Sequence, residues 1–63
     1  MKSVSYEEFQ NTMRKLGAIG PEADFSLDGR VVEDYWYPDR REVAGFISYW
    51  DDGTTNYIIT EHR

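Results

Sequence analysis

The side chains most often used in catalysis are scarce in this sequence. It contains no cysteine and a single histidine, His62. A general base must be held in place by its surroundings, and a residue beside a chain end is rarely held in that way. No base is predicted beside the four serines, Ser3, Ser5, Ser26 and Ser48. We therefore predict that the protein is not an enzyme and that it has no catalytic residue.

Three pairs of adjacent acidic residues are the other candidates for chemistry, since paired carboxylates can bind a metal ion or share a proton. The pairs are Glu7-Glu8, Glu33-Asp34 and Asp51-Asp52. Neighbours in a strand point to opposite faces, so Glu33 and Asp34 cannot meet at one metal. The spacing around Asp51-Asp52 differs from that of a calcium loop. No phosphate-binding loop or dinucleotide fingerprint is present, and we expect neither a cofactor nor a metal.

The charge balance restricts the class of partner. The 12 acidic residues outnumber the 7 lysines and arginines, which gives a net charge of -5 at pH 7. Surfaces that bind nucleic acid nonspecifically, or anionic membranes, need basic patches, so we expect neither as a direct partner. The first residues contain no apolar run, and we expect no signal peptide and no membrane span. The lack of cysteine fits a cytoplasmic protein.

The length of the chain limits how its core can be built. The 63 residues suffice for a single domain, residues 1–63, and leave no room for a second. Without disulfides, a core of this size depends on large side chains, and aromatic residues make up 16% of the sequence. This composition favours a folded domain over disorder.

Residues 5–16 carry the signals of one amphipathic helix. Ser5 and Glu8 have the spacing of a capping box, in which the side chain of each satisfies a free backbone N–H of the other. Gly17 supplies the left-handed residue that ends a helix. Apolar residues recur at a 3-4-3 spacing and form one stripe, namely Tyr6, Phe9, Met13 and Leu16.

Beyond the helix, runs of β-branched and aromatic residues alternate with turn signals. Asp28-Gly29 and Asp52-Gly53 are typical hairpin dipeptides, and Pro38 suits the second position of a wider turn. The strands that these signals delimit lie at about 30–37, 42–50 and 54–61, with or without a fourth at 24–27. The predicted fold class is therefore α+β, with one N-terminal helix packed on a three- to four-stranded antiparallel β-meander.

The turn lengths predict which strand residues lie opposite one another. We take Asp52-Gly53 as a two-residue loop and residues 38–41 as a four-residue loop. The pairs that follow are Trp50–Thr55, Ile47–Ile58, Trp36–Val43 and Val32–Ile47. A three-residue loop over 51–53 is the alternative, and it would shift the faces by one residue.

Both faces of this predicted sheet are apolar, although one helix can cover only one of them. An antiparallel sheet with one face in water normally alternates polar and apolar residues. The second face is therefore either shielded by residues 17–27 or used for binding, unless its aromatics serve only the core. Tyr and Trp dominate interface hot spots, so the tyrosine-rich face is the better candidate. The residues expected to bind a partner are Tyr35, Tyr37, Trp50, Tyr57, Glu33, Asp51 and Asp52.

Two functions are compatible with such a surface. The first is an inhibitor or adaptor, of the type that phages and mobile elements use, which docks on a host protein. Its target would be, for example, a basic groove that normally holds nucleic acid, where carboxylates replace phosphates. The alternative is a structural or regulatory homo-oligomer, in which the same face pairs with its own copy. An acidic surface that only keeps the protein in solution is a third interpretation.

Overall fold

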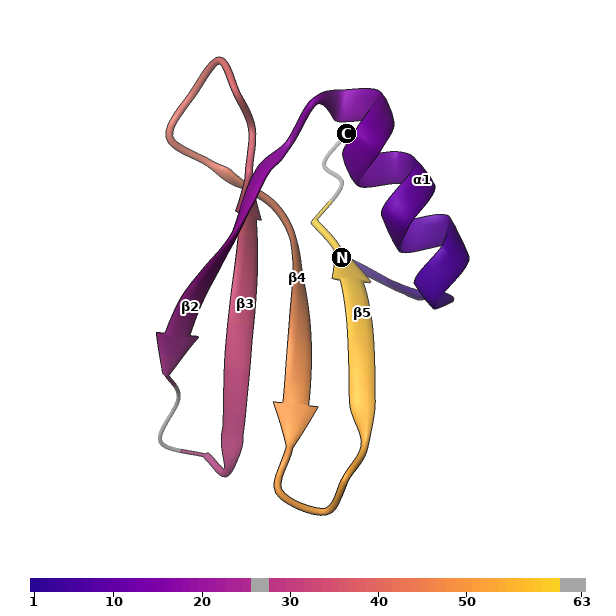
Figure 1. The fold of residues 1–63 in the computed structure, drawn as a ribbon, viewed down its shortest axis with the longest axis vertical. Helices are drawn as coiled ribbons and strands as arrows, with labels where there is room; N and C mark the ends of the chain where they lie inside the picture. The colour runs from indigo at the N-terminus through magenta and orange to yellow at the C-terminus, as the bar shows by residue number, and fades with distance from the viewer. Residues whose placement is uncertain (26–27, 61–63) are drawn as a thin grey trace.

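The computed structural model describes residues 1–25 and 28–60. Its elements are β1 (Lys2–Val4), α1 (Tyr6–Leu16), β2 (Ile19–Phe25), β3 (Arg30–Trp36), β4 (Val43–Trp50) and β5 (Thr55–Ile59). The strands form one antiparallel sheet in the order β1-β5-β4-β3-β2 (Figure 1). The predicted α+β class with one N-terminal helix is confirmed, but the sheet has five strands rather than three or four.

The two strands beyond the predicted three are the edges of the sheet, and the optional fourth strand predicted at 24–27 overlaps the end of β2 at residues 24–25. β1 has only three residues, too few for a visible pattern, and it pairs with β5. β2 begins at Ile19 and pairs with β3, with an irregularity between Ile19 and Glu22. Pro21 lies in this irregularity, where a residue without an N–H donor is tolerated at a sheet edge. Residues 19–25 therefore extend the sheet and do not shield its second face. Residues 26–27 and 61, at the ends of two predicted strands, lie outside the described part of the chain.

Helix α1 begins and ends at the predicted caps. The Ser5 Oγ accepts a hydrogen bond from the Glu8 backbone N–H at 3.1 Å. Gly17 has a φ of 67°, and its N–H donates to the Arg14 carbonyl at 3.1 Å. These bonds satisfy backbone groups that the helix leaves free at its ends. Local capping signals therefore fix the extent of the helix.

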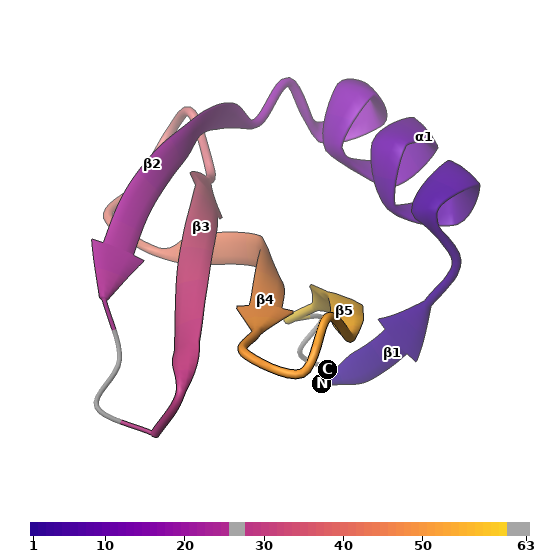
Figure 2. The ribbon, with the colours of Figure 1, turned by 60° about the horizontal axis from the view of Figure 1, so that its bottom comes forward.

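The core lies between α1 and the half of the sheet made by β4 and β5. At Gly45 the helix side chains pack directly on the backbone of β4, because a Cβ there would lie 2.9 Å from the Met13 Cε and 3.0 Å from a Phe9 ring carbon. Figure 2 shows α1 near β5 and β1, with β2 at the far side of the curved sheet. The buried apolar residues are Phe9, Met13, Ala44, Ile47 and Ile59. The helix therefore leaves the part of the same face near β2 uncovered.

The turn between β4 and β5 has three loop residues, not two. The Gly53 N–H donates to the Trp50 carbonyl at 3.0 Å, and the Trp50 N–H donates to the Thr54 carbonyl at 2.8 Å. Gly53 has a φ of 91°, as in a type I turn followed by a left-handed residue. The pairs found are Ile47–Tyr57 and Tyr49–Thr55, so the predicted pairs Ile47–Ile58 and Trp50–Thr55 are wrong by one residue.

A bulge changes the other predicted register. Trp36 lies opposite Val43, as predicted, but the register shifts between Tyr35 and Trp36. Val32 consequently lies opposite Ser48 and not opposite Ile47. An irregularity of this kind moves every later side chain of β4 by one position relative to β3. The two predicted faces are therefore each a mixture of the real ones.

Candidate functional site

Three side chains form an exposed row at the end of the sheet where the β2–β3 and β4–β5 turns lie. Phe25 lies opposite Val31, and Val31 lies opposite Tyr49. Tyr49 is four residues beyond Gly45, so all three point to the side of the sheet that carries α1. Their exposed fractions are 79%, 39% and 41%, respectively. Adjacent large apolar side chains in water are typical of an interaction surface. Phe25, Val31 and Tyr49 are called the exposed row below.

Glu33 holds Tyr49 in one orientation. The Tyr49 hydroxyl donates a hydrogen bond to the Glu33 Oε1 at 2.7 Å. This bond, together with partial burial and the negative charge of Glu33, raises the pKa of Tyr49 to about 12. A ring that is already fixed loses less conformational freedom when a partner covers it. The exposed row therefore has an ordered aromatic member with a carboxylate beside it.

Two turns bring further carboxylates to the same end of the molecule. The Asp51 N–H donates to the Gly29 carbonyl at 3.0 Å, which joins the β4–β5 turn to the β2–β3 turn. Hydrogen bonds from the Thr54 hydroxyl and backbone N–H hold the pKa of Asp52 below its usual range. Asp52 is thus ionised at neutral pH. Asp51 and Asp52 follow Tyr49 by two and three residues, so they place negative charge at this end of the exposed row.

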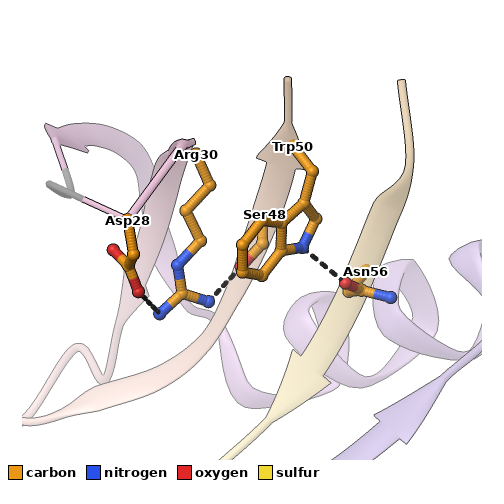
Figure 3. A network of polar contacts seen from close by, with 5 residues as sticks. All are labelled: Asp28, Arg30, Ser48, Trp50 and Asn56. Carbon is orange, nitrogen blue, oxygen red and sulfur yellow. Dashed lines mark hydrogen bonds and ion pairs between the residues drawn. The ribbon is translucent and has the colours of Figure 1, made fainter. Parts of the chain in front are cut away.

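The opposite side of the sheet, called the outer face below, carries a network of flat-lying side chains (Figure 3). An Arg30 guanidinium nitrogen donates to the Ser48 Oγ at 3.1 Å, and the guanidinium lies 4.9 Å from the Trp50 ring centroid. The Trp50 Nε1 donates to the Asn56 Oδ1 at 2.7 Å, and Arg30 pairs with Asp28 at 3.8 Å. Ser48 is only 1% exposed, although α1 lies on the other side. Arg30 and Trp50 therefore cover this end of the outer face.

Carboxylates gather at the other end of the outer face. Asp34 lies opposite Glu22, and Asp24 lies opposite Val32 on the next row. Partial burial, followed by the charges of Asp24 and Glu22, raises the pKa of Asp34 above its usual range. A shallow depression of about 300 Å³ is lined by Asp24, Asp34, Val32 and Phe46, and Arg30 and Phe25 line it as well. The outer face thus has an acidic end with apolar side chains beside it.

The aromatic residues predicted to bind a partner do not share one surface. The Tyr35 and Tyr57 rings lie 5.3 and 5.9 Å from the Phe9 ring, so both belong to the packing around the helix. Tyr37 is half-buried and packs against the core. Trp50 lies on the outer face, where it bonds Asn56. The one-residue shift of the β4–β5 register explains why Trp50 and Tyr57 were grouped.

The predicted acidic residues, in contrast, all lie close to Tyr49, either by contact or along the chain. Glu33 contacts Tyr49, while Asp51 and Asp52 form the adjacent turn. Sequence reasoning missed the exposed row itself, because the two-residue loop groups Trp50 with Tyr57 and thereby places Tyr49 on the opposite face. The three-residue loop over 51–53, which was weighed as the alternative, would have grouped Tyr49 with Tyr57.

The candidate metal ligands and the serines named above, apart from Ser26, lie in residues 1–25 and 28–60. Within these ranges, no group of His, Asp or Glu side chains is placed to hold a metal ion. Ser5 caps α1, and Ser48 bonds Arg30. Ser26 and His62 lie outside the described residues. The one helix of these ranges is not long and apolar enough to span a membrane.

Comparison of the chain with protein-family models, with curated proteins and with solved structures found no match.

Proposed function

We propose that the protein is a non-enzymatic binding module that docks on another protein through the exposed row. The observation that carries this proposal is the position of Phe25, Val31 and Tyr49. They are direct cross-strand neighbours on the face that carries the helix, and α1 does not cover them. An inhibitor or an adaptor needs such a surface, and it needs no catalytic group.

The size of the exposed row is sufficient for an interface hot spot. Aromatic side chains bury large areas and often act as anchors at the centre of an interface. Covering roughly 200 Å² of apolar surface contributes about 5 kcal/mol at 25 cal/mol per Å². Part of this free energy offsets the loss of translational and rotational freedom. Contacts at the rim of the interface supply the further binding free energy that a stable complex needs.

The charges around the exposed row specify the chemistry of the partner. Glu33 borders the row, and Asp51 and Asp52 form the turn beyond it. A partner that fits has an apolar pocket surrounded by lysine or arginine. A protein groove that normally holds nucleic acid has basic groups of this kind, and occupation of such a groove by this chain would inhibit the partner. Charge complementarity would mainly accelerate association.

The test compares two variants that each add one negative charge. Phe25→Asp changes the most exposed member of the row, and Asn11→Asp changes an exposed residue of α1. The tagged chain is used to isolate its partner from cells of its native source, and the dissociation constant is then measured with purified components. We expect Phe25→Asp to weaken binding by about 30-fold, as for a hot-spot residue, and Asn11→Asp to change it less than about twofold.

Equal binding by the wild-type chain and by Phe25→Asp would exclude the exposed row as the docking surface. Circular dichroism of both variants checks that the fold is kept. Because the Phe25 side chain is mostly in water, its replacement should leave the free energy of unfolding nearly unchanged.

A further inference from the structure

We infer that the partner adds a strand to the free edge of β2, in the form of an extended segment in which lysine or arginine alternates with apolar residues. This inference rests on the proposed function, because Phe25 belongs both to the exposed row and to this edge. It goes further by naming the conformation and the residue pattern of the segment that binds.

β2 is at one end of the sheet and has a paired strand on one side only, within residues 1–25 and 28–60. All seven of its residues are exposed. The outward backbone groups of such an edge can pair with an extended chain from another protein. The other edge strand, β1, has only three residues, so β2 is the longer of the two edges.

The hydrogen bonds at the end of β4 fix the direction of the backbone groups in the neighbouring strands, because these groups alternate between the two sides of a strand. The Trp50 N–H donates to the Thr54 carbonyl, on the β5 side. The N–H of Tyr49, the residue before it, therefore points to β3, where Tyr49 lies opposite Val31. Val31 accordingly directs its N–H and C=O at β4 and not at β2.

The N–H and C=O of Phe25 consequently point away from the sheet, because Phe25 lies opposite Val31. The Phe25 N–H donates to the Asp24 Oδ1 at 2.9 Å, which agrees with this direction. An incoming carbonyl would take the place of this oxygen and leave the Asp24 carboxylate free. The backbone groups of Ala23, two residues earlier, point the same way as those of Phe25. A strand that pairs with β2 can therefore bond Ala23 and Phe25, whereas Pro21 has no N–H to offer.

The side chains of β2 define the residue pattern of the added strand. Ala23 and Phe25 lie on the helix side, and Glu22 and Asp24 alternate with them on the outer face. In antiparallel pairing, a residue that bonds Ala23 or Phe25 has its own side chain on the helix side. Apolar residues suit these positions, where they would extend the exposed row. Lysine or arginine suits the alternate positions, beside the two carboxylates.

The acidic outer side of β2 favours a basic segment. Partial burial and the charges of Asp24 and Glu22 raise the pKa of Asp34, which lies opposite Glu22. Arg30 and Arg41 line depressions beside these carboxylates, yet the two negative charges still act on Asp34. A lysine from an added strand would lie next to Asp24 and reduce this repulsion.

A second copy of β2 fits this edge poorly. Two-fold pairing of Ala23 with Phe25 would place Asp24 against Asp24, and pairing of Ala23 with Ala23 would place Glu22 against Asp24. Like charges directly opposite one another destabilise a strand pair. The segment that fits therefore comes from a different protein.

Synthetic peptides test the strand pairing separately from the rest of the partner. An eight-residue peptide alternates lysine and valine, and its control has the same composition, with all lysines followed by all valines. NMR titration of the isotope-labelled chain measures both dissociation constants. We expect the alternating peptide to bind at least about tenfold more tightly, and the Ala23 amide to exchange more slowly with solvent in its presence. Glu22→Lys should weaken this binding more than Glu7→Lys, which makes the same change of charge on α1.

N-methylation of the alternating peptide tests the direction of pairing. In the antiparallel arrangement the valine N–H groups bond β2, whereas the lysine N–H groups point away from it. Methylation of the valine nitrogens should abolish binding, and methylation of the lysine nitrogens should leave it nearly unchanged. Equal effects of the two methylations, or the reverse order, would overturn the inference, as would an alternating peptide that binds no better than its control.

Two variants of the chain separate this inference from the proposed function. Ala23→Pro removes an outward N–H and keeps the Phe25 side chain, and proline is tolerated where an edge N–H faces solvent. We expect both Ala23→Pro and Phe25→Asp to weaken binding to the isolated partner, Ala23→Pro by about fivefold or more. A loss in Phe25→Asp alone would overturn the strand pairing and keep the exposed row, whereas unchanged binding by both would overturn both. If circular dichroism shows that Ala23→Pro is not folded, the two methylated peptides decide.

Discussion

Glu33 sets the ionisation of Tyr49, the ordered aromatic residue of the exposed row. The Tyr49 hydroxyl donates to the Glu33 carboxylate, and the pKa of Tyr49 rises to about 12. In Glu33→Gln the acceptor is uncharged, so we expect the pKa of Tyr49 to fall toward the ordinary tyrosine value of about 10. Titration of the tyrosinate absorbance measures this change, and Tyr49→Phe identifies the transition that belongs to Tyr49. An unchanged titration curve in Glu33→Gln would contradict the assigned hydrogen bond.

The raised pKa of Tyr49 also determines how the stability of the fold depends on alkaline pH. The folded state keeps the Tyr49 proton at a pH at which the unfolded chain releases it. The contribution of this bond is therefore fully present below pH 10 and is lost as the pH rises toward about 12. The free energy of unfolding should fall less steeply across this window in Glu33→Gln than in the wild-type chain.

The contact between α1 and β4 depends on the absence of a side chain at Gly45. A Cβ at Gly45 would lie 2.8 Å from the Ile58 carbonyl oxygen, which is backbone, and 2.9 Å from the Met13 Cε. We expect Gly45→Ala to lower the free energy of unfolding by about 1–3 kcal/mol, as overpacking does. Denaturation by urea measures the loss.

A double-mutant cycle with Met13→Ala provides the control for this contact. Met13→Ala removes one of the atoms that the new Cβ would meet. The free energy of unfolding lost in the double variant should therefore be smaller than the sum of the losses in the two single variants. Strict additivity would show that Gly45 and Met13 do not touch, and that the helix does not pack on β4 as described.

The elements that local signals define were predictable, and those that depend on pairing were not. The caps Ser5 and Gly17 fixed the helix, because each acts within a few residues of its own position. β1 is held only by its pairing with β5, from the other end of the chain. The irregularity between Tyr35 and Trp36 leaves no composition signal, yet it decides which side chains face the helix. The carboxylates of the candidate site were therefore predicted from the sequence, whereas its apolar residues were not.

At the scale of the whole molecule, a single helix on a five-stranded sheet leaves two surfaces free. One is the exposed row on the helix side, bordered by Glu33 and the Asp51-Asp52 turn. The other is the outer face, where Arg30 and Asp34 line one shallow depression. A chain with a net charge of -5 repels its own copies in general. A basic partner, in contrast, is attracted to the molecule as a whole.

Photo-crosslinking tests most directly whether the exposed row docks on another protein. A benzophenone amino acid replaces either Tyr49, on the exposed row, or Phe46, on the outer face of the same strand. The two aromatic positions are three residues apart and point to opposite sides. In cells of the native source, irradiation should join the chain labelled at Tyr49 to a different protein, whereas the chain labelled at Phe46 should give no such product. A foreign protein joined only through Phe46, or no foreign protein joined through Tyr49, would contradict the proposed docking surface.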